Sequence, residues 1–325
     1  MVDSAGPATR RRAGWGLPII AALVVVAALA QPWLRQALDV PAVANWSTIF
    51  VAVVVQATPF LVLGVAVSGA VTAFVPAGAI TRVLPGRVAF AVPVAAVAGA
   101  ALPGCECGAV PVARRLMGHG VAPSAALTFL LSSPAVNPVV LVATAVAFPG
   151  RPEMVLGRAL GGLLAAAAVG WVWSLLGRDD LLRARRPVPE TGSPLVVFLA
   201  TAQHDFLSAG GFLVVGAAAA ATLQTVVPRA VVDAFAGSGW GSVLALAVLA
   251  VLLAICSEAD AFVAASLRQF SPTAQLAFLV VGPMVDVKLI ALHVGTFGRA
   301  FALRFVPLAF VCAVGSASLI GWLLL

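Results

Sequence analysis

Charged residues are scarce in this chain of 325 residues. Asp, Glu, Lys and Arg make up 10% of the sequence, hydrophobic residues make up 62%, and the mean hydropathy is +1.09. A soluble domain carries about 25% charged residues, because its surface must face water. The composition therefore argues against a soluble globular protein, a single-anchor enzyme and a disordered scaffold. It predicts an all-α polytopic membrane protein.

Sequence motifs of several enzyme classes are also missing. The chain has no Gly-Lys-Ser/Thr nucleotide-binding loop, and it has neither a His-Glu-x-x-His nor a Gly-x-Ser-x-Gly motif. Its four Cys residues, two of them one residue apart, do not indicate a disulfide-stapled secreted fold. We therefore expect a protein that is not an enzyme and needs no cofactor.

The formal net charge is +7, yet the basic residues are dispersed along the chain. Their clusters, at residues 10–12 and 178–186, flank apolar stretches, as the positive-inside rule describes for cytoplasmic loops. We therefore expect a lipid bilayer and no nucleic acid as the partner of this charge. Residues 13–34 carry no charge and exceed the usual core of a signal peptide, which predicts a retained first helix in the cell (inner, cytoplasmic) membrane.

A polar connector rich in Arg and Pro divides the chain near its middle. Charge-free stretches on both sides of it predict about 8–10 transmembrane or re-entrant helices. The predicted organisation has a cytoplasmic tail (1–15), a first transmembrane helix with its loop (16–43), a first membrane repeat (44–177), an Arg-rich cytoplasmic loop (178–194) and a second membrane repeat (195–325).

Two homologous repeats are predicted from collinear matches between the halves. Residues 60–64 (Phe-Leu-Val-Leu-Gly) recur as residues 212–216 (Phe-Leu-Val-Val-Gly) at an offset of 152, and Cys105 falls opposite Cys256. Internal repeats are typical of secondary transporters, whose substrate sites lie near the bilayer midplane and often on discontinuous helices. The sequence therefore favours a substrate site on the interrupted segments of each half.

Loop charge bears on the orientation of the repeats. If residues 88–116 enter and leave the membrane on one side, then Arg82, Arg87, Arg114 and Arg115 all become cytoplasmic, together with the central loop. Each half then crosses the membrane an odd number of times, which makes the repeats inverted. Parallel repeats remain the alternative.

The most informative segment is residues 103–108 (Pro-Gly-Cys-Glu-Cys-Gly), which interrupts an apolar stretch. Pro and Gly break helices, and irregular backbone at membrane depth is tolerated only where protein or a water-filled cavity surrounds it. In such a loop Cys105 and Cys107 can converge on one soft metal or metalloid ion, which thiolates prefer. The alternative is that both cysteines serve as small hydrophobic residues.

Five charged residues lie within or beside apolar stretches: Glu106, Glu258, Asp260, Asp286 and Lys288. A charge at the centre of a membrane helix costs about 2.5–3.5 kcal/mol on insertion scales, so such residues usually face a protein interior or a transport path. We expect them to couple proton movement or to form ion pairs. A purely structural buried pair is the alternative.

Asn137 lies between two prolines and is the repeat partner of Asp286, at an offset of 149. A helix broken by proline frees backbone groups that can bind a substrate, and the Asn amide both donates and accepts hydrogen bonds. The sequence therefore favours a substrate contact at Asn137, with a self-satisfied kink as the alternative.

Several of these segments resemble one known family. Residues 103–111 (Pro-Gly-Cys-Glu-Cys-Gly-Ala-Val-Pro) and 129–138 (Phe-Leu-Leu-Ser-Ser-Pro-Ala-Val-Asn-Pro) carry the resemblance, together with residues 256–262 and 282–288 in the second half. The sequence is similar to the YraQ-like predicted permeases, which include the trivalent organoarsenical efflux permeases (ArsP). The similarity covers residues 45–310. This chain departs from the expected pattern by placing Glu106 between the cysteines, where a small residue such as Ser is expected.

The resemblance implies an inner-membrane permease that exports a soft small-molecule or ion substrate, such as a trivalent organoarsenical. The resemblance assigns the Cys pair to Cys105 and Cys107, the proline-flanked Asn to Asn137, and the charged positions to Asp260, Asp286 and Lys288. Together with the residue pattern, we expect substrate binding at Cys105, Glu106, Cys107, Asn137 and Cys256, with Cys105 and Cys107 as the metal or metalloid ligands. A protein of another class remains the alternative: a membrane redox or accessory subunit that uses the Cys pair with a protein partner. The sequence leaves the oligomeric state open.

Overall fold

The computed structural model describes residues 41–76, 82, 85–102, 105–177, 182, 193–226 and 239–325, and all regular structure in these ranges is helical. Within these ranges, five helical segments are long and apolar enough to cross a membrane. They are α3 (Pro41–Phe74), the consecutive helices α7 (Pro123–Val136) and α8 (Pro138–Ala147), α9 (Pro152–Leu176), α10 (Pro194–Val226) and α16 (Arg299–Leu324). The prediction of an all-α polytopic membrane protein is confirmed.

The other described helices are too short to cross a bilayer alone. They have 10 to 15 residues, which at about 1.5 Å per residue falls short of the roughly 30 Å hydrocarbon core. They are α5 (Val88–Ala100), α6 (Glu106–Gly118), α12 (Gly239–Leu253), α13 (Ser257–Ser266), α14 (Pro272–Val281) and α15 (Val287–Phe297). Their polar ends must therefore find partners within the protein.

Backbone contacts divide the chain into two units, Met1–Ser47 and Thr48–Leu325. Of the first unit the structure describes residues 41–47, which begin α3. The predicted tail at 1–15, the start of the predicted first helix at 16–40 and nearly all of the loop at 178–194 lie outside the described residues. Because α3 begins at Pro41, it runs across the boundary predicted between residues 43 and 44.

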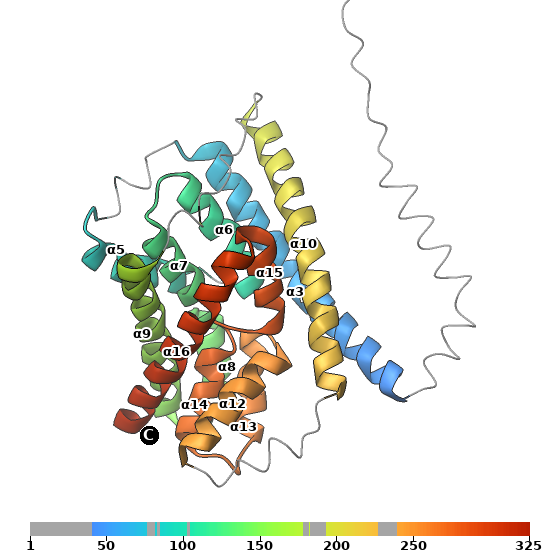
Figure 1. Ribbon diagram of the computed structural model, residues 1–325, viewed down its shortest axis with the longest axis vertical. Helices are drawn as coiled ribbons and strands as arrows, with labels where there is room; N and C mark the ends of the chain where they lie inside the picture. Colours follow the sequence, from blue (N-terminus) through green and yellow to red (C-terminus); the bar gives the residue numbers. More distant parts are fainter. Residues whose placement is uncertain are drawn as a thin grey trace, which may run out of the picture. The chain divides into compact units, whose positions relative to one another are not determined.

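Within the second unit, the helices of the two halves pack in the same order (Figure 1). In the first half α5 packs on α7 and α7 on α9, and in the second half α12 packs on α14 and α14 on α16. The helices α9 and α16 then pack against each other, and Ser316 Oγ donates a hydrogen bond to the Gly161 carbonyl oxygen at 3.0 Å. The short helices cross between halves, because α6 contacts α15 and α13 contacts α8.

Large apolar side chains cover the outer faces of the long helices. Exposed Val, Leu and Trp residues occur along each of them, for example Val55, Leu175, Leu207, Leu303 and Trp322. Monomeric soluble proteins rarely expose contiguous apolar surface on this scale. The chain is therefore a multi-pass membrane protein, and these faces contact lipid.

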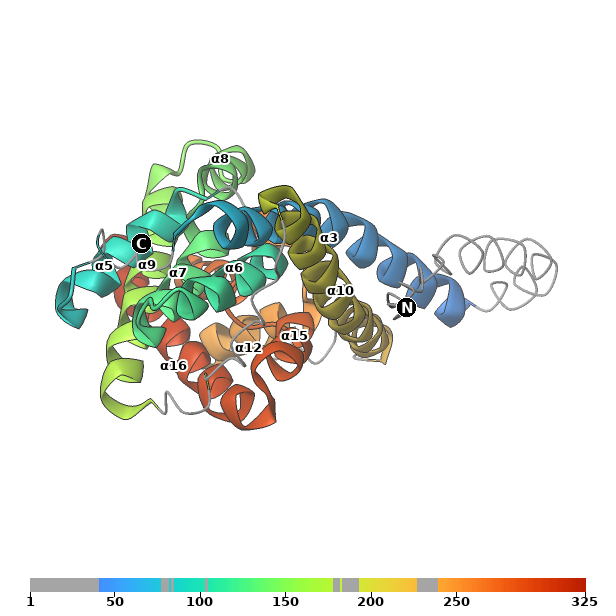
Figure 2. The same cartoon turned by 90° about the horizontal axis from the view of Figure 1, so that it is seen from above.

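The glycines that end the two matched pentapeptides lie at close helix contacts. A Cβ atom on Gly64 of α3 would overlap the backbone of Gly108 in α6. A Cβ atom on Gly216 of α10 would lie 2.6 Å from the Lys288 Cα atom in α15. In Figure 2 the long helices α3 and α10 lie beside the shorter ones. Both glycines therefore let a long helix approach the backbone of a short helix that begins inside the membrane.

We expect Gly64→Ala to destabilise the purified protein by about 1–3 kcal/mol, because the new methyl group meets backbone that cannot move aside. Gly211→Ala is the matched control, since nothing lies within 4 Å of a Cβ atom there. That control should be neutral or slightly stabilising, because Ala favours helix over Gly. Thermal unfolding in detergent checks both variants, and equal midpoints for the two would refute the close contact.

Candidate functional site

The first helix break lies at the start of α6. Cys105 is its N-cap residue, with extended backbone (φ −80°, ψ 170°), and Cys107 lies in the first turn. The prediction of one irregular loop for both cysteines is corrected here, because the helix already begins at Glu106. The two thiols still come within hydrogen-bonding reach of each other, since an N-cap residue does not follow helical geometry. Pro103 and Gly104 lie outside the described residues.

A buried ion-pair cluster joins this break to the second half of the chain. Lys288 Nζ lies 2.6 Å from Glu106 Oε1 and 3.3 Å from Asp286 Oδ2. The same ammonium group donates hydrogen bonds to the carbonyl oxygens of Ala254, at 2.9 Å, and Ile255, at 3.3 Å. All three charged side chains are buried. The predicted charged positions Glu106, Asp286 and Lys288 therefore meet at one point, which we call the Lys288 cluster.

The second helix break precedes α13. Cys256 is the N-cap residue of this helix, and Glu258 and Asp260 lie in its first turn. Ala254 has a φ of 47°, a region that residues other than glycine rarely adopt. Its carbonyl oxygen accepts the hydrogen bond from Lys288, and the Cys256 thiol lies close enough to the same ammonium group to feel its charge. The second break thus contributes two backbone oxygens to the cluster.

Helix N-termini from both halves surround the Lys288 ammonium group. Glu106 begins α6, the carbonyls of Ala254 and Ile255 precede α13, and Asp286 is the N-cap of α15. A helix N-terminus favours negative charge and disfavours positive charge. The two carboxylates suit this field, whereas Lys288 sits in the first turn of α15 against it. The ammonium group is therefore held by its oxygen partners alone.

Asn137 and Asp286, matched positions of the predicted repeats, are both helix caps. Asn137 Oδ1 accepts a hydrogen bond from Val140 N at 3.0 Å, at the start of α8. Asp286 Oδ1 accepts one from Leu289 N at 2.6 Å, at the start of α15. Asn137 Nδ2 also donates to the carbonyl oxygen of Ser133 at 3.1 Å. Both of these hydrogen bonds of Asn137 stay within its own chain segment. The contact of Asn137 with substrate stays a prediction.

A buried arginine that sequence reasoning missed lies beside α13. Arg158 of α9 is fully buried, and it donates hydrogen bonds to Thr144 Oγ1 at 2.9 Å and to the Ser257 carbonyl oxygen at 2.8 Å. The carboxylates of Asp260 and Glu258 act on it at longer range. Its position inside an apolar stretch could have marked Arg158 as a buried residue. However, a basic residue directly before a charge-free stretch is also typical of the end of a transmembrane helix. Arg158 thus places a buried first-half cation in the neighbourhood of the acids of α13.

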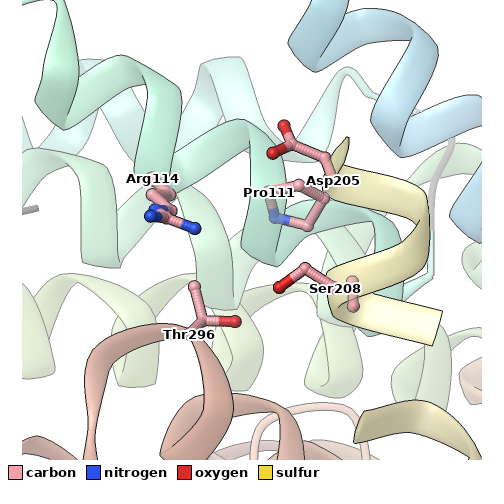
Figure 3. A pocket seen from close by; sticks show the side chains of 6 residues that line it. Pro111, Arg114, Asp205, Ser208 and Thr296 are labelled. Atoms are coloured by element: carbon pink, nitrogen blue, oxygen red, sulfur yellow. The ribbon is translucent and has the colours of Figure 1, made fainter. Parts of the chain in front are cut away.

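A second ion pair lies at another part of α6. Arg115 Nη2 lies 3.0 Å from Asp205 Oδ1, and Ser68 Oγ donates to Asp205 Oδ2 at 2.7 Å. Arg115, which the loop-charge hypothesis places on the cytoplasmic side, is buried in this pair, because α6 continues to Gly118 and the ion pair joins it to α10. A small open pocket beside this pair takes side chains from α6, α10 and α15 (Figure 3): Pro111, Arg114, Asp205, Ser208, Ala209 and Thr296. None of the predicted substrate residues lines it.

In the part of the chain that the structure describes, no three His, Cys, Asp or Glu side chains are grouped as ligands for a metal ion. The assignment of Cys105 and Cys107 as metal or metalloid ligands stays a prediction.

Broken helices that begin inside the bilayer, with buried polar groups where they meet, are typical of membrane transport proteins. The family model ArsP_1, described as "Predicted permease", matches residues 42–321. The chain therefore belongs to this permease family, and the resemblance found from its motifs is confirmed.

Two curated relatives support the same family. The chain is 34% identical over 284 residues to "UPF0718 protein YcgR" of Bacillus subtilis (strain 168), covering 84% of this chain and 96% of that protein. It is 30% identical over 271 residues to a protein of Streptococcus mutans serotype c (strain ATCC 700610 / UA159), covering 79% of this chain and 89% of that protein. The name of the second relative describes it as a candidate subunit of a two-component membrane permease complex. No solved structure matches the chain significantly.

We expect Arg158→Met to destabilise the protein by about 1–3 kcal/mol, because the buried Thr144 hydroxyl and Ser257 carbonyl lose a charged hydrogen-bond donor. Arg151→Met is the matched control. Its guanidinium pairs with Glu153 at 3.2 Å, and the two side chains are 40% and 38% exposed, so its loss should change stability by roughly 0–1 kcal/mol. Unfolding midpoints of the purified variants in detergent check this, and an Arg158 variant as stable as the control would contradict the buried role.

Proposed function

We propose that this permease is a secondary-type transporter of the cell membrane that exports a soft metal or metalloid species, such as a trivalent organoarsenical. The observation that carries this proposal is the burial of Cys105 and Cys107 at a helix break beside the ion pair of Glu106 and Lys288. Cysteines that merely fill space need no helix break and no charged neighbours. Thiolates bind thiophilic metals and metalloids in preference to hard ions.

The spacing of the thiols suits a trivalent organoarsenical. Such a molecule keeps one carbon substituent on arsenic and has two positions left for thiolates. Cys105 and Cys107 lie within hydrogen-bonding reach of each other, so one arsenic atom can bind both after a small adjustment of their side chains. Cys256, at the start of α13, adds a thiol from the second half. A substrate that binds Cys256 and one of the two cysteines of α6 would link α6 to α13 and thereby contact both halves.

The buried acids are proposed to couple transport to proton movement. Asp286 lies against Lys288, whereas Asp260 and Glu258 lie near Arg158. Each carboxylate thus has a buried cation nearby. A change in the protonation of Asp260 or Glu258 would alter their attraction to Arg158 in the first half, and a change at Asp286 would alter the charge around Lys288, which pairs with Glu106 of the first half. Ion pairing without proton transfer is the simpler role for the same residues.

The packing order supports the proposed duplication. In both halves a long helix is followed by a short helix, a helix break and further helices that meet in the same sequence of contacts. The cross-contacts are reciprocal, since α6 meets α15 and α13 meets α8. Reciprocal contacts of this kind are expected for two halves related by a pseudo-two-fold axis, and parallel and inverted arrangements both have such an axis.

A role as a membrane redox or accessory subunit is the second candidate. It is favoured by the name of the Streptococcus mutans relative, which describes a complex subunit. In that role Cys105 or Cys107 would form a mixed disulfide with a partner protein, and the chain alone would carry no flux. Substrate-dependent flux through the purified protein in liposomes would exclude this as its sole role, whereas a trapped disulfide-linked partner would favour it.

We expect cells that express the wild type to accumulate several-fold less of one thiophilic species than cells without the protein. Cys105→Ser/Cys107→Ser should abolish this difference at equal membrane levels, because the substrate loses both thiol ligands. Time-resolved accumulation of methylarsenite, arsenite and a panel of soft metal ions measures the effect.

Cys312→Ser is the matched control. This cysteine is half-buried in α16, and its replacement should leave accumulation at the wild-type level. The proposal fails if the double variant lowers accumulation as well as the wild type does, or if no species in the panel responds to the wild type.

A further inference from the structure

Lys288 is the only lysine in the chain, and it occupies an unfavourable position. Its side chain is fully buried in a membrane protein, and it lies in the first turn of α15, where the helix dipole repels a cation. A buried charge costs free energy even when it is paired. A lysine that only joined two helices would avoid that repulsion if it lay in a later turn of α15, because the dipole effect is confined to the end of the helix. Its position therefore needs a reason beyond helix packing.

The surroundings of the ammonium group are those of a bound cation. Four oxygen atoms lie within 2.6 to 3.3 Å of Lys288 Nζ, two of them carboxylate oxygens and two of them backbone carbonyl oxygens. They come from the start of α6, from the residues before α13 and from the N-cap of α15. Glu106 Oε2 is buried and makes no hydrogen bond within the described residues. The cluster therefore holds a cation and keeps one further carboxylate oxygen available.

The proposed soft ligands border the same position. The thiols of Cys107 and Cys256 both interact electrostatically with the Lys288 ammonium group. The thiol of Cys105 lies within hydrogen-bonding reach of Cys107. A mixed set of thiols and carboxylates suits a thiophilic ion that also carries positive charge, whereas an uncharged thiol reagent needs no carboxylate. Within the proposed class of soft substrates, the oxygen shell thus favours a metal cation over an uncharged organoarsenical.

We propose that the Lys288 ammonium group is a resident cation, and that a cationic thiophilic substrate takes its place beside Glu106 and Asp286. This inference rests on the proposed function, because the neighbouring thiols must bind the substrate. In the empty carrier, the single positive charge of Lys288 compensates one of the two buried carboxylate charges, so the protein can return without cargo and with at most one uncompensated charge in the cluster. In the loaded carrier the substrate provides the positive charge. Lys288 therefore competes with the substrate for the two carboxylates. This competition limits the affinity of the protein for the substrate and allows the substrate to be released.

Binding of Cd²⁺ to the purified protein tests the competition. Lys288→Met should bind Cd²⁺ more tightly than the wild type by about tenfold or more, because the internal competitor is gone. Equilibrium dialysis of the wild type, Lys288→Met and Cys105→Ser/Cys107→Ser measures this. An unchanged or weaker affinity in a folded Lys288→Met protein would overturn the inference, as would the absence of Cd²⁺ binding in both the wild type and this variant.

A second measurement needs no lysine variant. Because the chain has one lysine, protein grown with ¹³C-labelled lysine gives a single side-chain NMR signal, that of Lys288. Cd²⁺ should shift this signal, and phenylarsine oxide, an uncharged reagent for neighbouring thiols, should bind the same cysteines and leave it nearly in place. A signal that stays fixed while Cd²⁺ binds, or that moves equally with both probes, would refute displacement by charge.

The outcomes separate this inference from the proposed function. Cd²⁺ binding that needs Cys105 and Cys107 but ignores Lys288 would retain the thiol site and eliminate the resident cation. Cd²⁺ binding that strengthens in Lys288→Met but persists in the double Cys variant would eliminate the thiol site, and with it both the proposed function and this inference.

Discussion

A single ammonium group inside the membrane constrains much of this structure. The positive charge of Lys288 needs several oxygen partners, and no one segment of the chain supplies them all. Glu106 comes from the first half, and Asp286 and two backbone carbonyls come from the second. The starts of three helices must therefore stay together wherever this charge stays buried. The ion pair thus makes the joining of the two halves an electrostatic requirement as well as a packing one.

Helix breaks inside the bilayer follow from the same constraint. A continuous helix uses its own carbonyl oxygens and presents few of them to a cation, whereas the residues before α13 leave the carbonyls of Ala254 and Ile255 free to accept hydrogen bonds. Close packing then seals the breaks from lipid, because Gly64 and Gly216 let the long helices reach the short-helix backbones. The thiols of Cys105 and Cys256, at the N-caps of α6 and α13, therefore lie where open backbone groups and buried charges come close together.

The sequence supported the architecture and part of the site, for identifiable reasons. Composition and apolar stretches predicted the membrane-spanning helices, and scarce charges at membrane depth marked Glu106, Asp286 and Lys288, which the structure brings together. Local pattern could not predict pairings between distant segments, such as Arg158 with the carbonyl of Ser257 or Arg115 with Asp205. A basic residue near the end of an apolar stretch suits a cytoplasmic loop equally well. Whether Asn137 caps α8 also depends on the path of the backbone after Pro134, and the residue types alone did not predict that path.

The central claim is that substrate is held where α6 and α13 begin, and anomalous scattering tests it most directly. A structure of the protein with methylarsenite bound, recorded at the arsenic absorption edge, would locate arsenic without any assumption about its ligands. The account predicts one peak in bonding contact with the sulfur atoms of Cys105 and Cys107. A peak at the pocket beside Arg114 and Asp205, or anywhere else away from these thiols, in a protein that still transports methylarsenite would contradict it.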